Sequence, residues 1–235
     1  MADFTGAGCF VTGTDTGVGK TVVSCALIRE LRARGLGVGA IKPIETGVGP
    51  DGPLDAIALR DAAGSTDPLA TICPQQFALP AAPNAAASAE DREVDLTAID
   101  AAYETLAKGR DLMVVEGAGG LLVPIRDDWT MAELAHRLDL PLLVVARASL
   151  GTINHTALTL EVAASKALPV LGVIISHAGG PISAADASNL LALKKFLGDQ
   201  LIGEIPPLGP TEAPPADAID IDALTQRLLP DRKPD

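Results

Sequence analysis

The stretch that decides the fold reads Gly13-Thr14-Asp15-Thr16-Gly17-Val18-Gly19-Lys20-Thr21. Apolar residues flank it at 9–12 and 22–28, which predicts a buried strand, a glycine loop and the start of a helix. Such a turn directs backbone N–H groups and the positive end of a helix dipole at one point, and Lys20 and Thr21 add an ammonium and a hydroxyl there. We therefore expect a site for a polyphosphate and its Mg²⁺.

The glycine spacing departs from the usual phosphate-loop pattern. Four residues commonly separate the first glycine from the Gly-Lys pair, whereas five lie between Gly13 and Gly19. The alternative is a glycine-rich turn whose lysine is only solvated. The strand expected before the loop and the helix expected after it favour the phosphate site.

Composition favours a parallel α/β protein. Of the 235 residues, 48% are hydrophobic, but only 3% are aromatic and 20% charged. Cores of Ala, Val, Leu and Ile are typical of parallel sheets that helices cover on both faces. The length suits one domain over residues 1–235, with loose termini at 1–7 and 230–235.

Charge and cysteine content exclude several classes of protein. A net charge of −12 argues against a nucleic-acid surface, which needs clustered Lys and Arg. No apolar run reaches about 18 residues and the first residues lack the features of a signal peptide, so we expect a cytoplasmic protein without a membrane segment. The three cysteines and three histidines are too scattered to indicate a disulfide framework or a metal site.

Helices and strands alternate along the rest of the chain. Short apolar runs at 38–41, 112–115, 141–146, 170–175 and 201–205 predict further buried strands. Further segments predict helices at 22–34, 54–63, 184–197 and near 222–229. Another helix is expected between the cap Asp95 and the stop Gly109, and one at 131–138 after the cap Thr130. The turn at 150–155 begins a helix that runs to Lys166. Residues 45–53 are predicted to form a loop. Residues 65–91, broken by four prolines, are expected to be irregular and lid-like.

Two charged residues follow predicted strands directly. Lys42 comes after the strand at 38–41, and Glu116 comes after the strand at 112–115 and before glycines that allow close backbone approach. The carboxyl ends of parallel strands meet at one edge of a sheet, where ligands bind. The alternatives are a solvated lysine at a strand end and a surface acid that caps a turn.

These motifs together closely resemble the dethiobiotin synthetase family. The resemblance rests on the loop with its five-residue spacing, which is the family's own form, and on Lys42-Pro43-Ile44-Glu45-Thr46, Asp55, Val115-Glu116-Gly117-Ala118-Gly119-Gly120-Leu121 and Leu150-Gly151-Thr152-Ile153-Asn154-His155-Thr156. It implies a P-loop NTPase-like three-layer sandwich and a homodimer whose site lies at the subunit interface. It also implies a reaction in which Mg-ATP, CO₂ and 7,8-diaminononanoate give dethiobiotin, ADP and phosphate. The family forms a carbamate, phosphorylates it and closes the ring with the second amine.

The resemblance also assigns roles to residues. The implied catalytic residues are Lys42, Lys20 and Thr16. The implied Mg²⁺ ligands are Thr21, Asp55 and Glu116. The implied nucleotide-binding set comprises Gly17, Val18, Gly19, Lys20, Thr21, Val22, Asp55, Glu116, Ser176, His177, Pro206, Pro207 and Leu208. The implied substrate contacts are Thr46, Gly117, Ala118, Gly119, Gly151, Ile153 and Asn154. Oxygen ligands of this type suit Mg²⁺, which usually keeps several waters.

One position departs from the family pattern. Family members commonly carry Asn-Asp after the fifth strand to bind the adenine edge, whereas this chain has Ser176-His177. Serine offers one hydroxyl in place of the paired donor and acceptor groups of an amide. We expect weaker discrimination between ATP and other nucleoside triphosphates than an Asn would give.

Two other kinds of ATPase share this type of loop. Cobyrinate-type amidotransferases add a glutaminase domain with a nucleophilic cysteine, for which 235 residues leave no room. Regulatory ATPases of the ParA and MinD type carry a second lysine five positions before the main one, where this chain has Asp15. They also need a basic patch or amphipathic tail, which the last residues do not supply convincingly.

Overall fold

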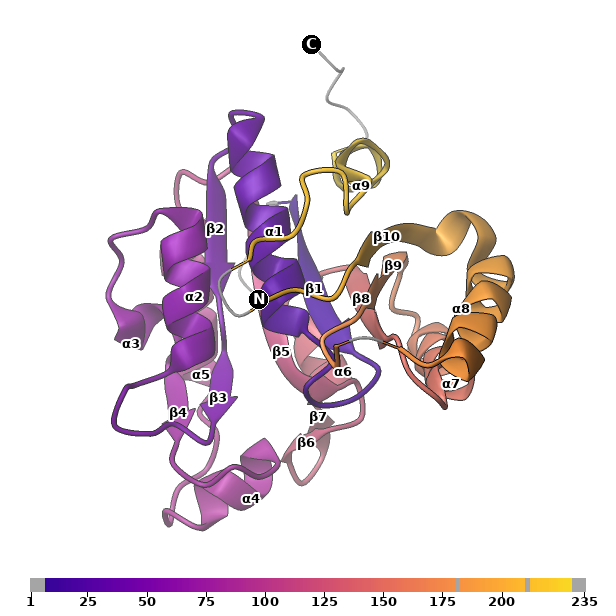
Figure 1. Ribbon diagram of the computed structural model, residues 1–235. Helices are drawn as coiled ribbons and strands as arrows, with labels where there is room; N and C mark the ends of the chain where they lie inside the picture. Colours follow the sequence, from indigo (N-terminus) through magenta and orange to yellow (C-terminus); the bar gives the residue numbers. More distant parts are fainter. Residues whose placement is uncertain (1–6, 181, 210–211, 230–235) are drawn as a thin grey trace.

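The computed structural model describes residues 7–180, 182–209 and 212–229. Its centre is a six-stranded parallel sheet in the order β10-β9-β8-β1-β5-β2 (Figure 1). The strands are β1 (Ala7–Gly13), β2 (Val38–Ile41), β5 (Leu112–Gly120), β8 (Leu142–Arg147), β9 (Val170–Ser176) and β10 (Leu201–Ile205). All six strands predicted from the sequence are confirmed. Ala7 begins β1, while residues 1–6 and 230–235 of the expected loose termini lie outside the described residues.

Helices cover both faces of this sheet, as predicted. Buried side chains of one face gather with α1 (Lys20–Ala33), α2 (Leu54–Ala63) and α9 (Ile221–Leu228). Those of the other face gather with α5 (Leu96–Ala107), α6 (Met131–Arg137), α7 (Thr152–Ser165) and α8 (Ala184–Leu197). A 3₁₀ turn, η1 (Gly198–Gln200), leads from α8 into β10. None of the helices in the described part of the chain is long and apolar enough to cross a membrane.

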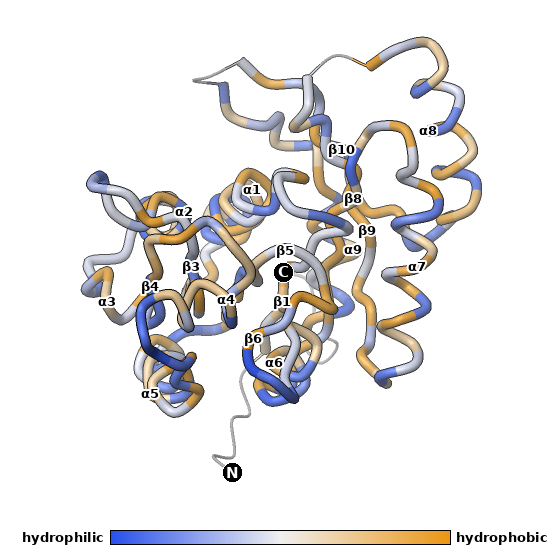
Figure 2. Tube along the Cα trace, turned by 90° about the horizontal axis from the view of Figure 1, so that it is seen from below, coloured by the Kyte–Doolittle hydropathy of each residue, from blue (hydrophilic) through white to orange (hydrophobic). Residues whose placement is uncertain are grey.

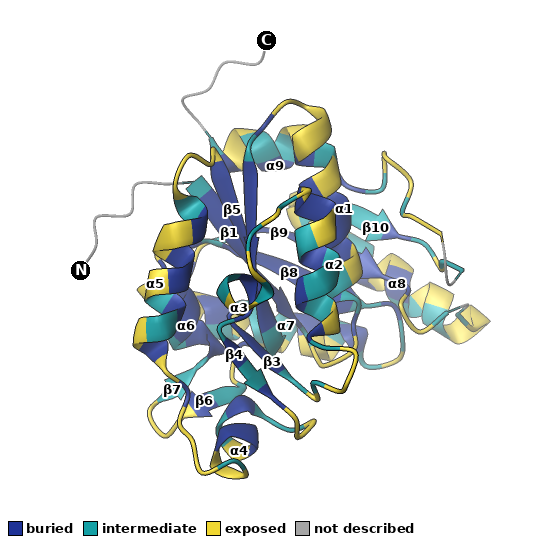
Figure 3. Ribbon diagram, turned by 90° about the vertical axis from the view of Figure 1, so that its left-hand side faces the viewer, coloured by how far each residue is buried: buried dark blue, intermediate teal, exposed yellow. Residues whose placement is uncertain are grey.

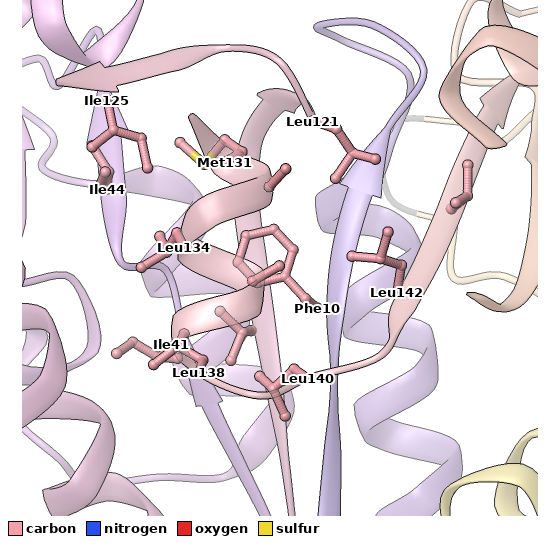
Figure 4. Packing of buried hydrophobic residues seen from close by; sticks show 14 of the residues in the cluster. Phe10, Ile41, Ile44, Leu121, Ile125, Met131, Leu134, Leu138, Leu140 and Leu142 are labelled. Carbon is pink, nitrogen blue, oxygen red and sulfur yellow. The ribbon is translucent and has the colours of Figure 1, made fainter. Parts of the chain in front are cut away.

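The strands bury alternate side chains in two separate cores. Phe10 of β1 packs in the core beneath α5 and α6, while its neighbour Val11 packs in the core beneath α1. Figure 4 shows Phe10 among Leu134, Leu138 and other side chains of the first core. The strands are buried while the outer helix faces are exposed (Figure 3), and β8 and β9 are hydrophobic along most of their length (Figure 2). Burial on both faces is what a near-continuous apolar strand requires.

Short elements outside the central sheet correct two expectations and add a hairpin. The region predicted as a loop at 45–53 begins with the end of β3 (Ile44–Thr46). The region expected to be irregular at 65–91 contains α3 (Leu69–Ile72), β4 (Gln75–Phe77) and α4 (Pro83–Ser88), and β3 pairs with β4 in parallel. A hairpin of β6 (Pro124–Arg126) and β7 (Trp129–Thr130) was also not predicted. Elements of two to six residues are too short to carry a recognisable period.

The sheet order places the glycine loop where the chain direction switches. From β1 the chain crosses over to β2 on one side, while β8 lies against β1 on the other side. Ligands of open α/β sheets bind outside the carboxyl ends of the strands at such a switch point. The fold therefore supports a binding site at the loop after β1.

Candidate active site

The glycine loop forms a tight turn that only glycine allows at one position. Gly19 precedes α1 with φ of 93°, and a Cβ there would lie 2.4 Å from Ser176 Oγ. Its carbonyl accepts the N–H of Val23 at 3.0 Å. Helix α1 begins at Lys20, two residues earlier than predicted, so its first N–H groups face the loop. This is the backbone geometry of an anion site at a helix N-terminus.

Arg147, at the end of β8, hydrogen-bonds two residues of this loop. Arg147 Nη2 donates to Asp15 Oδ2 at 2.6 Å and to the Thr16 carbonyl at 3.3 Å. Asp15 Oδ1 in turn accepts the N–H of Thr16 at 2.7 Å. Asp15 and Thr16 of the loop are thereby held against the neighbouring strand β8. Thr16 itself is exposed, as a residue facing reactants would be.

The two predicted strand-end residues meet beside the loop. Lys42 Nζ lies 2.7 Å from Glu116 Oε1, 2.8 Å from Asp55 Oδ2 and 3.2 Å from the Gly117 carbonyl oxygen. Thr21 Oγ1 lies 2.8 Å from Asp55 Oδ1 and 2.9 Å from Glu116 Oε1. Lys42 is therefore a buried, fully partnered cation, which excludes a lysine that is only solvated. Glu116 is likewise buried inside β5 and is no surface acid.

The electrostatics of the two lysines differ. Burial alone would lower the pKa of Lys42, but the charges of Glu116 and Asp55 raise it above the ordinary value. Burial followed by repulsion from Lys42 lowers the pKa of Lys20 to about 8. An added anion therefore stabilises the charged form of Lys20 more than that of Lys42, which already has two carboxylate partners. Burial opposes the ionisation of Asp55, but the charge of Lys42 outweighs burial and lowers the pKa of Asp55. That carboxylate therefore stays charged.

The donor set fits a hard divalent cation. Glu116 Oε2 is buried and has no hydrogen-bond partner within the described residues. Together with Asp55 and the Thr21 hydroxyl it offers oxygen atoms that converge beside the phosphate loop. Mg²⁺ is commonly held by one or two carboxylates, with phosphate oxygens and water completing its shell.

A cavity of about 490 Å³ lies beyond the end of β9, where a nucleotide base was expected. His177, Glu204, Pro206, Pro207, Pro215, Asp217 and Ala218 line it. His177 Nε2 lies 2.8 Å from Glu204 Oε1, and Lys194 pairs with the same carboxylate. Ser176 packs against the glycine loop at Gly19, and Leu208 packs against the core beneath α1. The structure thus gathers most of the expected base contacts in one region.

A second cavity of about 390 Å³ lies between the loop and α7. Its lining comprises Gly13 to Thr16, Gly120 to Pro124, His155, Leu158, Thr159 and Val162. Of the expected substrate residues, Gly119 lies next to Thr16, and Gly151, Ile153 and Asn154 form the first turn of α7. Thr46 ends β3, and Ala118 lies within β5. Gly117 contacts Lys42 directly, because its carbonyl oxygen accepts from the ammonium.

The remaining loop residues divide by exposure. Val18 is buried in the core beneath α1, Gly17 is exposed with φ of 70°, and Val22 is exposed on α1. They shape the loop rather than present polar side chains to a ligand.

Three polar residues near the site were not predicted to belong to it. Arg147 holds the loop, Glu204 lines the base-side cavity, and Glu45 hydrogen-bonds the backbone of α2. Arg147 and Glu204 each interrupt or end an apolar strand, which is a signal that could have been used. Glu45 carried no such signal, because its strand has only three residues.

Comparison with known proteins places these features in context. Residues 7–215 match a family model described as an AAA domain. An ATP-dependent dethiobiotin synthetase BioD of Anaeromyxobacter dehalogenans strain 2CP-C is 51% identical over 189 residues, which is 78% of this chain and 85% of that protein. The ATP-dependent dethiobiotin synthetase BioD of Thermodesulfovibrio yellowstonii is 41% identical over 212 residues, covering 85% of this chain and 88% of the relative.

Among solved structures, the MinD cell division protein of Aquifex aeolicus is similar with a TM-score of 0.56. The match covers 97% of this chain and 99% of MinD at 17% sequence identity. At that identity the similarity concerns the fold alone. It confirms the P-loop NTPase-like α/β fold.

Proposed function

We propose a site mechanism for this chain from the premise that it belongs to the AAA-domain family and, within it, to the ATP-dependent dethiobiotin synthetases. It is an ATP-dependent ligase of biotin biosynthesis. The proposed reaction joins CO₂ to 7,8-diaminononanoate and closes the ureido ring, with ATP converted to ADP and phosphate. The observation that carries the proposal is the Lys42 ammonium, buried between Asp55 and Glu116 beside the phosphate loop.

The glycine loop binds the phosphates in this proposal. The backbone N–H groups at the start of α1 and the Lys20 ammonium hold the β and γ phosphates. Binding an anion favours the charged form of Lys20, whose pKa burial lowers to about 8. Phosphoryl transfer depends almost entirely on such positioning and charge stabilisation.

We assign Thr21, Asp55 and Glu116 as the Mg²⁺ ligands. The unpartnered, buried Glu116 Oε2 supports this assignment, because a buried carboxylate oxygen without a partner is costly. When bound, Mg²⁺ would neutralise phosphate charge during the transfer. The protein's own part is to keep Asp55 ionised and both carboxylates fixed, which Lys42 and Thr21 do.

Lys42 acts on the substrate side. One amine of the substrate attacks CO₂ and loses a proton, which gives a carbamate. A carbamate oxygen attacks the γ phosphorus and ADP leaves. The second amine then attacks the carbamoyl carbon and loses a proton, phosphate leaves and the ring closes. The Lys42 ammonium stabilises the negative charge of the carbamate and of the moving phosphoryl group, while Thr16 faces the reacting groups.

The substrate's apolar tail suits the cavity between the loop and α7. Leu122, Val123, Leu158 and Val162 give that cavity an apolar side. Leu150 is exposed just before α7 and Leu158 is exposed in the middle of that helix, which supports a homodimer that covers them. In such a dimer the first turn of α7, with Gly151, Ile153 and Asn154, receives the substrate carboxylate of the facing subunit.

We also propose the cellular setting. The reaction consumes ATP, and the cysteines are unpaired thiols, both of which suit the cytoplasm. One continuous central sheet supports a single catalytic domain.

The test of the mechanism is ADP release from Mg-ATP with and without 7,8-diaminononanoate. Wild-type protein should release ADP only when the diamine and bicarbonate are present. Lys42→Ala should lower that rate by about 10²–10³-fold, the usual loss on removing one charge-stabilising group. Lys166→Ala, which removes a lysine paired with Glu133 away from the loop, is the matched control. Wild-type turnover in Lys42→Ala would refute the role given to Lys42.

A further inference from the structure

Helix α2 begins without a side-chain cap of its own. Its N-cap is Pro53, which makes no side-chain hydrogen bond to the helix. The first N–H groups of a helix have no partner inside the helix and need an acceptor from elsewhere. Glu45, on β3, supplies it: Oε1 accepts the N–H of Asp55 at 3.1 Å and Oε2 accepts the N–H of Ala56 at 3.0 Å.

This contact fixes the backbone of a residue whose side chain belongs to the site. Asp55 Oδ2 lies 2.8 Å from Lys42 Nζ, and Oδ1 lies 2.8 Å from Thr21 Oγ1. The Asp55 side chain is 40% exposed, whereas that of Lys42 is 4% exposed. Asp55 therefore stands at the rim of the cluster, where packing constrains it little. The backbone contact with Glu45 supplies the missing constraint.

A carboxylate is an expensive way to cap this helix. Glu45 is only 7% exposed, and it stands near another carboxylate, that of Asp55. A Ser or Asn in place of Pro53 would satisfy the same N–H groups locally at lower cost. What Glu45 adds is a link between elements, because it lies on the three-residue strand that starts just after Lys42 and ends at Thr46.

We propose that Glu45 is a positioning residue that sets Asp55 for metal–nucleotide binding by holding the first turn of α2 against β3. The inference rests on the proposed function, because the position of Asp55 matters only if its carboxylate holds the metal of the nucleotide complex. Partners that orient a metal ligand typically contribute about 10–100-fold to metal affinity.

The experiment measures Mn²⁺ binding in the presence of ADP by electron paramagnetic resonance, with Mn²⁺ standing in for Mg²⁺. Wild type is compared with Glu45→Ala and Glu45→Gln. Glu45→Ala should weaken Mn²⁺ affinity about 10–100-fold. Glu45→Gln should weaken it about three- to tenfold, because its amide keeps one acceptor but presents N–H to the second helix N–H.

Asp95→Ala provides the matched control. Asp95 caps α5 by accepting the N–H groups of Thr97 and Ala98, away from the loop. Its loss should lower the thermal midpoint comparably to Glu45→Ala but change Mn²⁺ affinity less than about twofold. If Glu45→Ala does not fold, the Glu45→Gln affinity decides the question.

Three results would overturn the inference, and the third would overturn the proposed metal site as well. Wild-type Mn²⁺ affinity in both Glu45 variants would show that Asp55 needs no such support. Equal weakening by Asp95→Ala would show a general effect of lost stability. A wild-type protein that binds ADP but no Mn²⁺ would instead refute the proposed metal site, and this inference with it.

Discussion

In the proposed mechanism, Lys42 and a bound divalent cation compete for the negative charge of the same two carboxylates. The Lys42 ammonium lies 2.7 Å from Glu116 Oε1 and 2.8 Å from Asp55 Oδ2, so it supplies the positive charge that both carboxylates need. A metal bound to Asp55 and to the unpartnered Oε2 of Glu116 weakens the attraction of both carboxylates for the ammonium, which becomes available to the substrate. Lys42→Met removes the competing charge and keeps the unbranched stem. We predict that this variant binds Mn²⁺ more tightly than wild type in the absence of nucleotide.

The size of the effect follows from the burial of the pair. Removing one partner of a buried ion pair costs about 3–5 kcal/mol. Water reduces this figure here, because the Asp55 side chain is 40% exposed. A remaining difference of about 2 kcal/mol corresponds to roughly thirtyfold in affinity, at about 1.4 kcal/mol per factor of ten.

The assay is a Mn²⁺ titration followed by electron paramagnetic resonance without nucleotide. Lys166→Met carries the same net charge as Lys42→Met and removes a lysine that is paired with Glu133. It should bind Mn²⁺ like wild type. If Lys42→Met binds Mn²⁺ no more tightly than wild type and Lys166→Met, the competition between ammonium and metal is refuted.

Three further predictions concern selectivity, thiols and pH. Turnover with CTP, GTP or UTP should fall within about tenfold of turnover with ATP, because Ser176 offers one hydroxyl in place of the paired groups of an amide. A strong ATP preference that Ser176→Asn leaves unchanged would contradict this prediction. Burial raises the thiol pKa of Cys9, Cys25 and Cys73 to about 12. A disulfide reagent at pH 8 should therefore label these cysteines only after the protein unfolds. Burial opposes the ionisation of Glu133, yet hydrogen bonds from Lys166 and Thr130 lower its pKa to about 2. Its stabilising contribution is therefore full above the ordinary value of about 4.3 and is lost as the pH falls towards 2. Glu133→Gln should lower the thermal midpoint at pH 7, and the difference from wild type should shrink as the pH falls from about 4 towards 2.

The sequence predicted the central sheet because its strands are apolar on both faces. Runs such as β8 and β9 can only be buried strands between two helix layers, and residues after them must lie at one sheet edge. That reasoning brought Lys42 and Glu116 together correctly. The helix caps Asp95 and Thr130 were likewise predicted and are confirmed by their hydrogen bonds to helix N–H groups.

Local pattern did not reveal contacts made across the fold. Arg147 reaches Asp15 from a strand 132 positions later in the chain. Glu45 lies in a strand of three residues whose partner, β4, was hidden among prolines. In both places the contact depends on tertiary pairing rather than on periodicity. The charge at the end of β8 marks Arg147 as a candidate residue, but its partner Asp15 is visible only in the fold, and Glu45 carries no signal at all.

In the proposed function, this chain carboxylates and cyclises a diamine and consumes ATP. The most direct measurement incubates the purified protein with Mg-ATP, ¹⁴C-bicarbonate and 7,8-diaminononanoate, and counts the label that survives acid. A carbamate loses its CO₂ in acid, whereas a closed ureido ring retains it. We predict acid-stable label that requires ATP and the diamine and is equal in amount to the ADP formed. ADP formation without acid-stable label would contradict the account.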